Sequence, residues 1–195
     1  MRYAVPALLV LLGCGSSWAS FSLTFQGLAQ ALNTGGITLV SPAGIVVDTA
    51  GDVYIVDTGN SRIVEVNAQG VASVVTITGL SPALSGPNGI AIDGSGNLYV
   101  ADTGNNRVVE ITAAGAGSAI STGSVTLSSP KGVALDQSGD IFVADTGNNR
   151  IVEVTSGGSA AALTITVSSG SSTLSSPIGL ALGRDRQTLH RRCQQ

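Results

Sequence analysis

The sequence has little charge, few aromatic residues and almost no cysteine. Of its 195 residues, 11% are charged and 4% are aromatic, whereas 43% are hydrophobic and 26 are glycine. Long helices need a mixture of Ala, Leu, Glu and Lys that is missing here. Abundant Gly, Ser, Thr, Val and Ile instead favour many short strands joined by tight turns. We therefore predict one all-β domain of ordinary size.

The scarcity of cysteine and histidine excludes several kinds of site. The two cysteines, Cys14 and Cys193, lie near the two ends of the chain, so no disulfide framework is expected. The single histidine, His190, lies in a C-terminal segment of different composition. A catalytic triad or a histidine-based zinc site is therefore not expected in residues 20–182. Neither GxxxxGK[ST] nor a GxGxxG after a strand is present, and no cofactor or metal is predicted.

Basic residues are also scarce in the body of the sequence. Residues 20–182 contain 11 acidic and four basic side chains, a net charge of −7. Phosphate binding needs clustered Lys and Arg, and three of these four cations recur at one repeat position. Nucleic acid is therefore excluded as a predicted partner.

The N-terminus has the pattern of an export signal, assigned to residues 1–19. Arg2 precedes an apolar run from Ala4 to Leu12, which is too short to span a bilayer and is followed by small residues. Two processing schemes remain open. Cleavage after Ala19 gives a secreted, extracellular or periplasmic protein. Alternatively, "LLGC" resembles a lipoprotein box, which would place a lipid anchor on Cys14 of an outer-envelope lipoprotein.

One segment of about 26 residues is written three times. The copies begin at Ser41, Gly86 and Ser129, and a fourth start, "SPIGLAL", begins at Ser176, giving intervals of 45, 43 and 47 residues. In the second copy, strands are predicted at 89–93, 98–102 and 107–111, separated by "DGSGN" and "TGNN" turns. A less regular fourth run follows, at 73–78 in the first copy and 162–167 in the third. Four strands per repeat of this length indicate a propeller blade.

These residues resemble a known family. The pattern G-[IV]-A-[IL]-D-x-x-G-[ND]-[LI]-[YF]-V-A-D-T-G-N-N-R-[IV]-V-E-[VI] is similar to the NHL repeat, and the resemblance covers about residues 41–182. It implies a six-bladed β-propeller, of which this chain would hold blades at 41–85, 86–128 and 129–175 and the start of a fourth at 176–182. Residues 20–40 would lead in, with "FSLTF" or "ITLVS" (37–41) supplying a strand to the first blade. An open arc with an exposed blade face is expected.

The repeated aspartate and arginine are predicted to be structural. Each Asp ends a second strand and each Arg begins the third, so the carboxylate can accept turn N–H groups and meet the guanidinium. A glycine in the turn, with the Asn beside it, is expected to relieve backbone strain. Residues identical in every copy should serve what every copy does, which is to form a blade. This signature comprises Asp57, Asp102, Asp145, Arg62, Arg107, Arg150, Gly59, Gly104 and Gly147.

Two further features of the repeats are candidate binding sites. The "D-x-x-G-[DN]" turns faintly resemble calcium loops but lack the additional oxygen ligands, and we interpret them as capped hairpin turns. Lys131 replaces Asn88 and Ala43 at the same repeat position. Lys131 is therefore predicted to contribute to a ligand surface, although a solvated lysine is the commoner outcome.

The C-terminus departs from the repeat. Residues 183–195, "GRDRQTLHRRCQQ", stand where a line such as "LDGSGNLYVAD" is due. Back-translation shifted by one nucleotide after codon 182 permits "DG[IT]G[RK]LYIADV". We therefore interpret the basic tail as a frameshift product, against the alternative of a functional arginine-rich segment; the nucleotide sequence tests this.

The sequence favours a noncatalytic role. We expect an exported scaffold that binds a protein or a glycan through its blade-connecting loops, since loops on a rigid scaffold commonly carry binding. The alternative follows from the resemblance, because related propellers include metal-dependent lyases and lactonases with catalytic groups around the channel. Under that alternative the fragment itself is no enzyme, and its parent's catalytic residues lay in missing blades.

Overall fold

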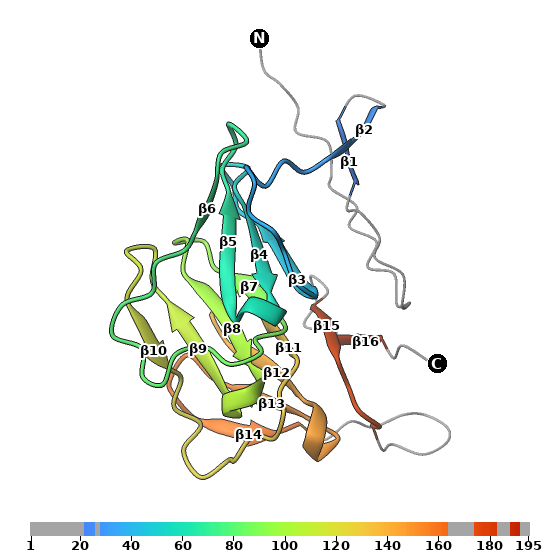
Figure 1. Ribbon diagram of the computed structural model, residues 1–195. Helices are drawn as coiled ribbons and strands as arrows, with labels where there is room; N and C mark the ends of the chain where they lie inside the picture. The colour runs from blue at the N-terminus through green and yellow to red at the C-terminus, as the bar shows by residue number, and fades with distance from the viewer. Residues whose placement is uncertain (1–21, 26–27, 164–173, 183–187, 192–195) are drawn as a thin grey trace.

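The computed structural model describes residues 22–25, 28–163, 174–182 and 188–191. Three four-stranded antiparallel sheets, here called sheets 1, 2 and 3, follow one another along the chain and fan out in an open arc (Figure 1). Each sheet keeps its strands in sequence order, so each repeat folds into one sheet. The predicted all-β blade architecture is confirmed.

The strands form in short apolar runs that are bounded by turn residues. Sheet 1 contains β3 (Pro42–Val47), β4 (Val53–Asp57), β5 (Arg62–Val66) and β6 (Ala72–Val74). Sheet 2 contains β7 (Ile90–Ile92), β8 (Leu98–Asp102), β9 (Arg107–Ile111) and β10 (Gly117–Ala119). Sheet 3 contains β11 (Gly132–Leu135), β12 (Ile141–Asp145), β13 (Arg150–Val154) and β14 (Ala160–Ala162).

Second and third strands are joined by a single 3-10 turn in every sheet. These turns are η1 (Thr58–Asn60), η2 (Thr103–Asn105) and η3 (Thr146–Asn148). Two hairpins complete the described chain: β1 (Ser22–Phe25) with β2 (Leu28–Ala31), and β15 (Gly179–Leu182) with β16 (Thr188–Arg191). Each hairpin is a separate two-stranded sheet.

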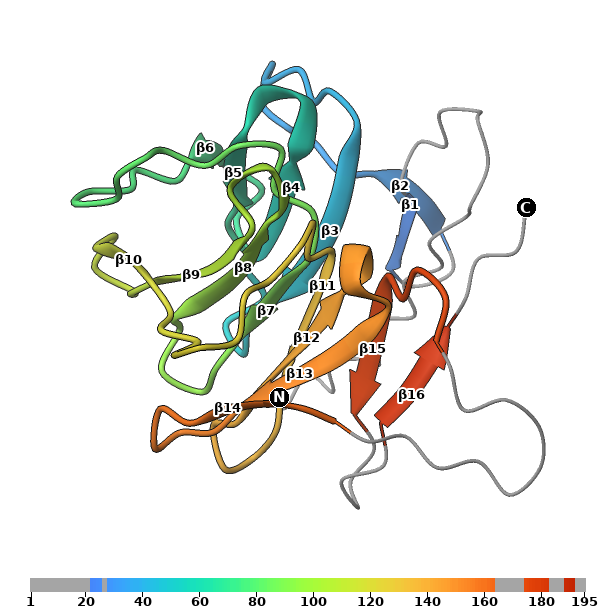
Figure 2. The same ribbon diagram turned by 90° about the horizontal axis from the view of Figure 1, so that it is seen from below.

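The core lies between successive sheets. One apolar cluster, which includes Val56, Ile63, Val100 and Val109, fills the space between sheets 1 and 2. A second, which includes Val108 and Val152, fills the space between sheets 2 and 3. Strands that are apolar on both faces are what this sandwiching requires. The first strands β3, β7, β11 and β15 lie next to one another along the inner side of the arc (Figure 2).

The fourth strands are shorter than the predicted runs. β6 ends at Val74, whereas the run was predicted to continue to Thr78. The N–H of Val75 still bonds the Ile63 carbonyl at 3.0 Å, after which the chain leaves the edge and crosses toward the next sheet. Val75 and Ile77 pack into the cluster between sheets 1 and 2. Their apolar character therefore serves the crossover and not the strand. The rest of the 162–167 run lies outside the described residues.

The free face of sheet 1 differs from the exposed blade face expected for an open arc. Val53, Ile55, Val64 and Val66 on this face are at most 6% exposed. Leu32, Ile37 and Leu39 of the lead-in pack against them. Residues 37–41, considered as a strand, form no strand before Pro42 and act as an apolar cover, while Ser22–Phe25 pairs only with β2.

Several sequence predictions fall outside the described residues. These are the signal segment 1–19 with Cys14 and most of the tail, including Cys193. Residues 188–191 of that tail do form β16. Within the described part of the chain, none of the helices has the length and apolar character needed to span a bilayer.

Candidate binding groove

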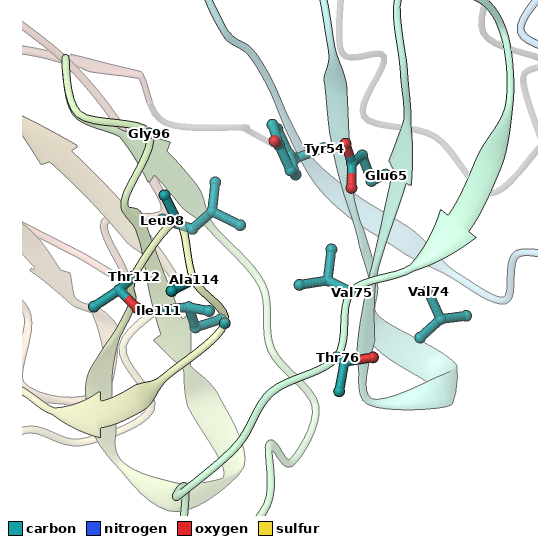
Figure 3. A pocket seen from close by; sticks show the side chains of 12 residues that line it. Tyr54, Glu65, Val74, Val75, Thr76, Gly96, Leu98, Ile111, Thr112 and Ala114 are labelled. Atoms are coloured by element: carbon teal, nitrogen blue, oxygen red, sulfur yellow. The ribbon is translucent and has the colours of Figure 1, made fainter.

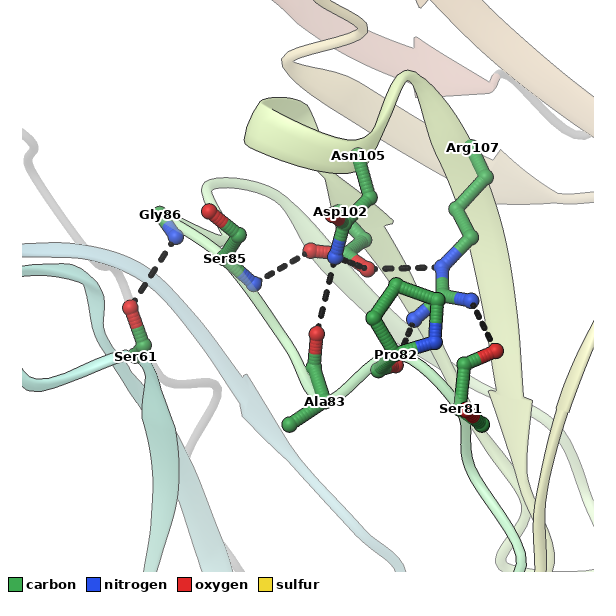
Figure 4. A network of polar contacts seen from close by, with 9 residues as sticks. All are labelled: Ser61, Ser81, Pro82, Ala83, Ser85, Gly86, Asp102, Asn105 and Arg107. Atoms are coloured by element: carbon green, nitrogen blue, oxygen red, sulfur yellow. Dashed lines mark hydrogen bonds and ion pairs between the residues drawn. The ribbon is translucent and has the colours of Figure 1, made fainter.

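The repeated Asp and Arg form a buried clamp at the end of each hairpin. The Asp102 carboxylate is 0% exposed and accepts hydrogen bonds from Arg107 Nε at 2.7 Å and Asn105 Nδ2 at 2.8 Å (Figure 4). Its other oxygen accepts the N–H of Ser85 at 2.7 Å. Ser85 belongs to the crossover that enters sheet 2, and Arg107 also donates to the Pro82 carbonyl there. The clamp therefore ties the incoming crossover to the sheet that follows it.

The same clamp recurs in the other two sheets. Asp57 and Asp145 are also 0% exposed and bond Arg62 and Arg150 at 2.7 Å. Burial opposes ionisation of Asp57, but hydrogen bonds from Asn60, the Val40 N–H and Arg62 outweigh it, so its pKa is lowered. The Asp–Arg contact was predicted. The N–H donor was expected within the turn. The aspartate makes no side-chain capping bond to the 3-10 turn, and the donor comes instead from the segment that enters the sheet.

The turn also reaches forward to the next sheet, a role that sequence reasoning missed. Thr58 Oγ1 donates to the Pro87 carbonyl at 2.7 Å, and Thr103 Oγ1 donates to the Pro130 carbonyl at 2.6 Å. The residue after the turn adds a second link, since Asn106 Oδ1 accepts the N–H of Ser129 at 2.7 Å. The signal that could have found this link is the same threonine before each turn glycine. The signature thus joins one blade to the next as well as closing its own hairpin.

The turn glycines serve a different purpose from the one predicted. The left-handed backbone is taken by the residue after the 3-10 turn, Asn106 with φ 54°, and Gly59, Gly104 and Gly147 are not in that region. A Cβ on Gly104 would lie 2.7 Å from the Ser85 carbonyl oxygen, and the Gly104 N–H bonds that oxygen at 2.8 Å. Glycine is required because the crossover passes too close for a side chain.

The "D-x-x-G-[DN]" turns are capped hairpin turns, as predicted. Asp93 Oδ1 accepts the N–H groups of Ser95 at 2.8 Å and Asn97 at 2.9 Å, and Gly96 takes φ 84°. Within the described residues, no group of three or more His, Cys, Asp or Glu is arranged to hold a metal ion. Lys131 precedes β11, is partly exposed, and donates its N–H to the Ala144 carbonyl at 3.1 Å.

A groove of about 240 Å³ lies between the outer parts of sheets 1 and 2 (Figure 3). One wall comes from β4, β5 and the crossover, and the other from β8, β9 and the turn that follows β9. Lys131, which the sequence predicted to contribute to a ligand surface, does not line this groove. The lining residues are Tyr54, Glu65, Val74, Val75, Thr76, Gly96, Leu98, Ile111, Thr112, Ala113, Ala114 and Gly115.

The polar end of the groove is acidic. Tyr54 and Glu65 face each other across β4 and β5, and both point toward the groove (Figure 3). Burial raises the pKa of Glu65, and the carboxylates of Asp52 and Asp48 raise it further. Burial and the charge of Glu65 likewise raise the pKa of Tyr54, whose phenol is therefore neutral at physiological pH. The site offers a neutral hydroxyl within a field of negative charge.

This corner differs from copy to copy. In sheet 2, Tyr99 donates to Glu110 at 3.2 Å, and Asn97 Nδ2 donates to Asp93 at 2.9 Å. Burial first, then Glu110 and Asp93, raise the pKa of Tyr99 to about 12. Sheet 1 has Asp52 where sheet 2 has Asn97, so an amide is replaced by a further carboxylate. In sheet 3, Phe142 removes the hydroxyl altogether. Sequence comparison of the copies could have identified this position.

Solved structures similar to this chain are β-propeller proteins. Streptogramin B lyase superposes with a TM-score of 0.64 at 18% identity, covering 80% of this chain and 49% of that chain. Virginiamycin B lyase from Staphylococcus aureus gives 0.61 at 23%, covering 76% and 48%. A putative gluconolactonase gives 0.61 at 16%, covering 84% and 60%. The chain thus spans about half the length of these proteins, and likeness at such identities shows the fold alone.

The family comparison agrees with the sheet boundaries. No curated protein matches the sequence. The family model for the NHL repeat matches residues 39–65, 84–111 and 127–153. Each match starts in a crossover, at or next to the residue whose N–H reaches the clamp aspartate, and ends near the end of a third strand. The chain therefore contains three NHL repeats, each of which forms one four-stranded propeller sheet.

Proposed function

We propose that the protein is an exported, noncatalytic recognition module whose groove between sheets 1 and 2 binds an extended segment of a partner protein. The observation that carries this proposal is the Tyr54–Glu65 corner. Among the three described sheets, only sheet 1 combines a tyrosine and a glutamate with an aspartate at position 52, because sheet 2 has Asn97 there and sheet 3 has Phe142 in place of the tyrosine. The corner opens into a groove formed largely by connecting segments. Export rests on the N-terminal sequence pattern alone.

The chemistry of the groove favours a basic, partly apolar peptide. Val75, Leu98 and Ile111 offer apolar contacts along the walls. Glu65, with Asp48 and Asp52 nearby, attracts a lysine or arginine side chain, and a phenol can accept or donate one further hydrogen bond. The three arginines of the described repeats are paired with the clamp aspartates. They therefore do not neutralise the carboxylates at the acidic end of the groove.

A peptide of alternating lysine and valine, labelled for fluorescence anisotropy, tests the proposal. Glu65→Gln should weaken binding about two- to fivefold, the range for a partly exposed ion pair. Because the pKa of Glu65 is raised above 4.5, affinity should fall on acidification at a higher pH than for an ordinary glutamate. Glu153→Gln is the matched control, since Glu153 has the same place in sheet 3, opposite Phe142.

Three results would contradict this function. One is equal affinity for a peptide in which glutamate replaces lysine. Another is equal loss in the two glutamine variants. The third is tighter binding to neutral oligosaccharides, which would support the glycan version of a recognition module in place of a protein partner.

The second candidate is a fragment of a propeller lyase or lactonase. It is favoured by the superposition on lyases and on a putative gluconolactonase. Under this candidate the catalytic groups lie in blades outside this chain, so the nucleotide sequence downstream of codon 182 tests it. Channel-facing His and Glu in a reading frame that continues the repeat would support it over the recognition module, and we expect none.

A further inference from the structure

The lead-in to sheet 1 repeats the contacts of a crossover between two sheets. Val40 donates its N–H to Asp57 as Ser128 does to Asp145, both at 2.6 Å. Arg62 donates to the Thr38 carbonyl as Arg150 does to Thr126. The Ile37 N–H bonds the Thr34 carbonyl, as the Val125 N–H bonds Thr122. Residues 31–40 are therefore equivalent, position by position, to residues 119–128.

This equivalence assigns a place to the N-terminal hairpin. Ala119 is the last residue of β10, the fourth strand of sheet 2, and its counterpart Ala31 is the last residue of β2. β2 thus stands where a fourth strand stands, at the start of a crossover. β1 pairs antiparallel with β2, as every third strand pairs with a fourth. The hairpin corresponds to the outer half of a blade that precedes sheet 1.

The C-terminal hairpin corresponds to the missing inner half. β15 lies beside β11 as β11 lies beside β7, which is the position of a first strand. Its register with β16 pairs Gly179 with Arg191, and the first and second strands of sheet 3 pair Gly132 with Ala144 in the same way. Each partner lies 47 residues after its counterpart. β16 therefore stands in the place of a second strand, with one edge unpaired.

We propose that these two hairpins combine, between two copies of the chain, into one four-stranded blade in the order β15–β16–β1–β2. Second and third strands pair antiparallel in all three complete sheets, so the free edges of β16 and β1 are complementary. The partner is a second copy because the arc superposes on only about half of each closed neighbour. An arc of that curvature needs a second set of blades to close, and closed propellers have four to eight.

Two surfaces support this partner. On the free face of sheet 1, Val74 is 43% exposed and pairs with Val64 of the buried cluster, so part of that face still lacks a neighbour. The charges are complementary as well: residues 183–195 carry four arginines and one aspartate, whereas residues 20–182 have a net charge of −7. The basic C-terminal segment of one copy is therefore attracted to the acidic repeats of the next.

Disulfide trapping tests the register. In a Cys14→Ser, Cys193→Ser background, aligning β16–β1 on β12–β13 places Leu189 opposite Leu23, the positions of Phe142 and Glu153. Opposed residues on neighbouring strands lie within disulfide range. Mixing chains with Leu23→Cys and chains with Leu189→Cys should yield an oxidised dimer. The control pair, Leu23→Cys with His190→Cys, places the two cysteines on opposite faces and should yield far less.

Mass measurement completes the test. Light scattering of the unmodified full chain should give about twice the mass of one chain. The Leu23→Pro variant should approach the mass of a single chain, since proline removes a strand donor. A monomer in which Leu23→Cys and Leu189→Cys of the same chain cross-link would refute the proposed pairing between two copies. Equal cross-linking in the control pair, or a monomeric unmodified chain, would overturn it too.

Discussion

Replacing Asp102 with alanine tests the clamp most directly. The Asp102 carboxylate is fully buried and accepts hydrogen bonds from Ser85, Asn105 and Arg107. Alanine leaves the Arg107 side chain, 14% exposed, without its counter-charge and leaves the Ser85 N–H without its acceptor. Removing one partner of a buried ion pair costs about 3–5 kcal/mol. We expect the free energy of unfolding to fall by that amount.

Urea unfolding followed by circular dichroism measures this loss. Adding Arg107→Met to Asp102→Ala removes the unpaired charge while keeping an apolar stem, so the double variant should recover part of the stability. Asp145→Ala is the matched comparison: the Arg150 side chain is 33% exposed, so its orphaned charge stays better hydrated and the loss should be smaller. A loss below about 0.5 kcal/mol for Asp102→Ala, typical of surface changes, would refute the clamp.

Two further changes probe the same turns. Gly104→Ala should cost about 1–3 kcal/mol by overpacking, because its Cβ would meet the Ser85 carbonyl; Gly94→Ala, with open space around it, should be neutral, and equal urea midpoints would contradict the close approach. The pKa of Asp57 lies below its ordinary 3.8, so its contribution is complete above that pH and is lost as pH falls through the lowered value. Asp57→Asn should therefore flatten the acid loss of stability, and an unchanged pH profile would contradict this.

Local features of the fold could be predicted from the sequence. The second and third strands of sheet 2 begin and end at the predicted residues, because Asn97, Asp102 and Arg107 mark their limits within a short stretch of chain. The Asp–Arg contact also follows from the register of one hairpin. Both depend on neighbours a few residues apart, which a single sequence contains.

Contacts made by distant segments could not be predicted in the same way. Ser85 lies 17 residues before Asp102, and nothing in either residue says that a crossover returns to the turn. The reason for Gly104 is hidden for the same cause, since glycine also suits a left-handed turn. The groove depends on how far sheets 1 and 2 splay apart, which is set by the packing between them and not by any motif.

The repeated signature limits the positions at which a ligand can bind. Within the described repeats, the polar signature side chains are already hydrogen-bonded to the segments that connect the sheets. Asp102 and Arg107 bond the crossover that precedes them, and Thr103 bonds the one that follows. A residue with both functions would have to break a link in order to bind. Recognition must therefore use positions that the repeat leaves free to vary. Position 52 is one of these, since sheet 1 has Asp52 near Glu65 where sheet 2 has the amide Asn97, and it lies beside the groove between sheets 1 and 2.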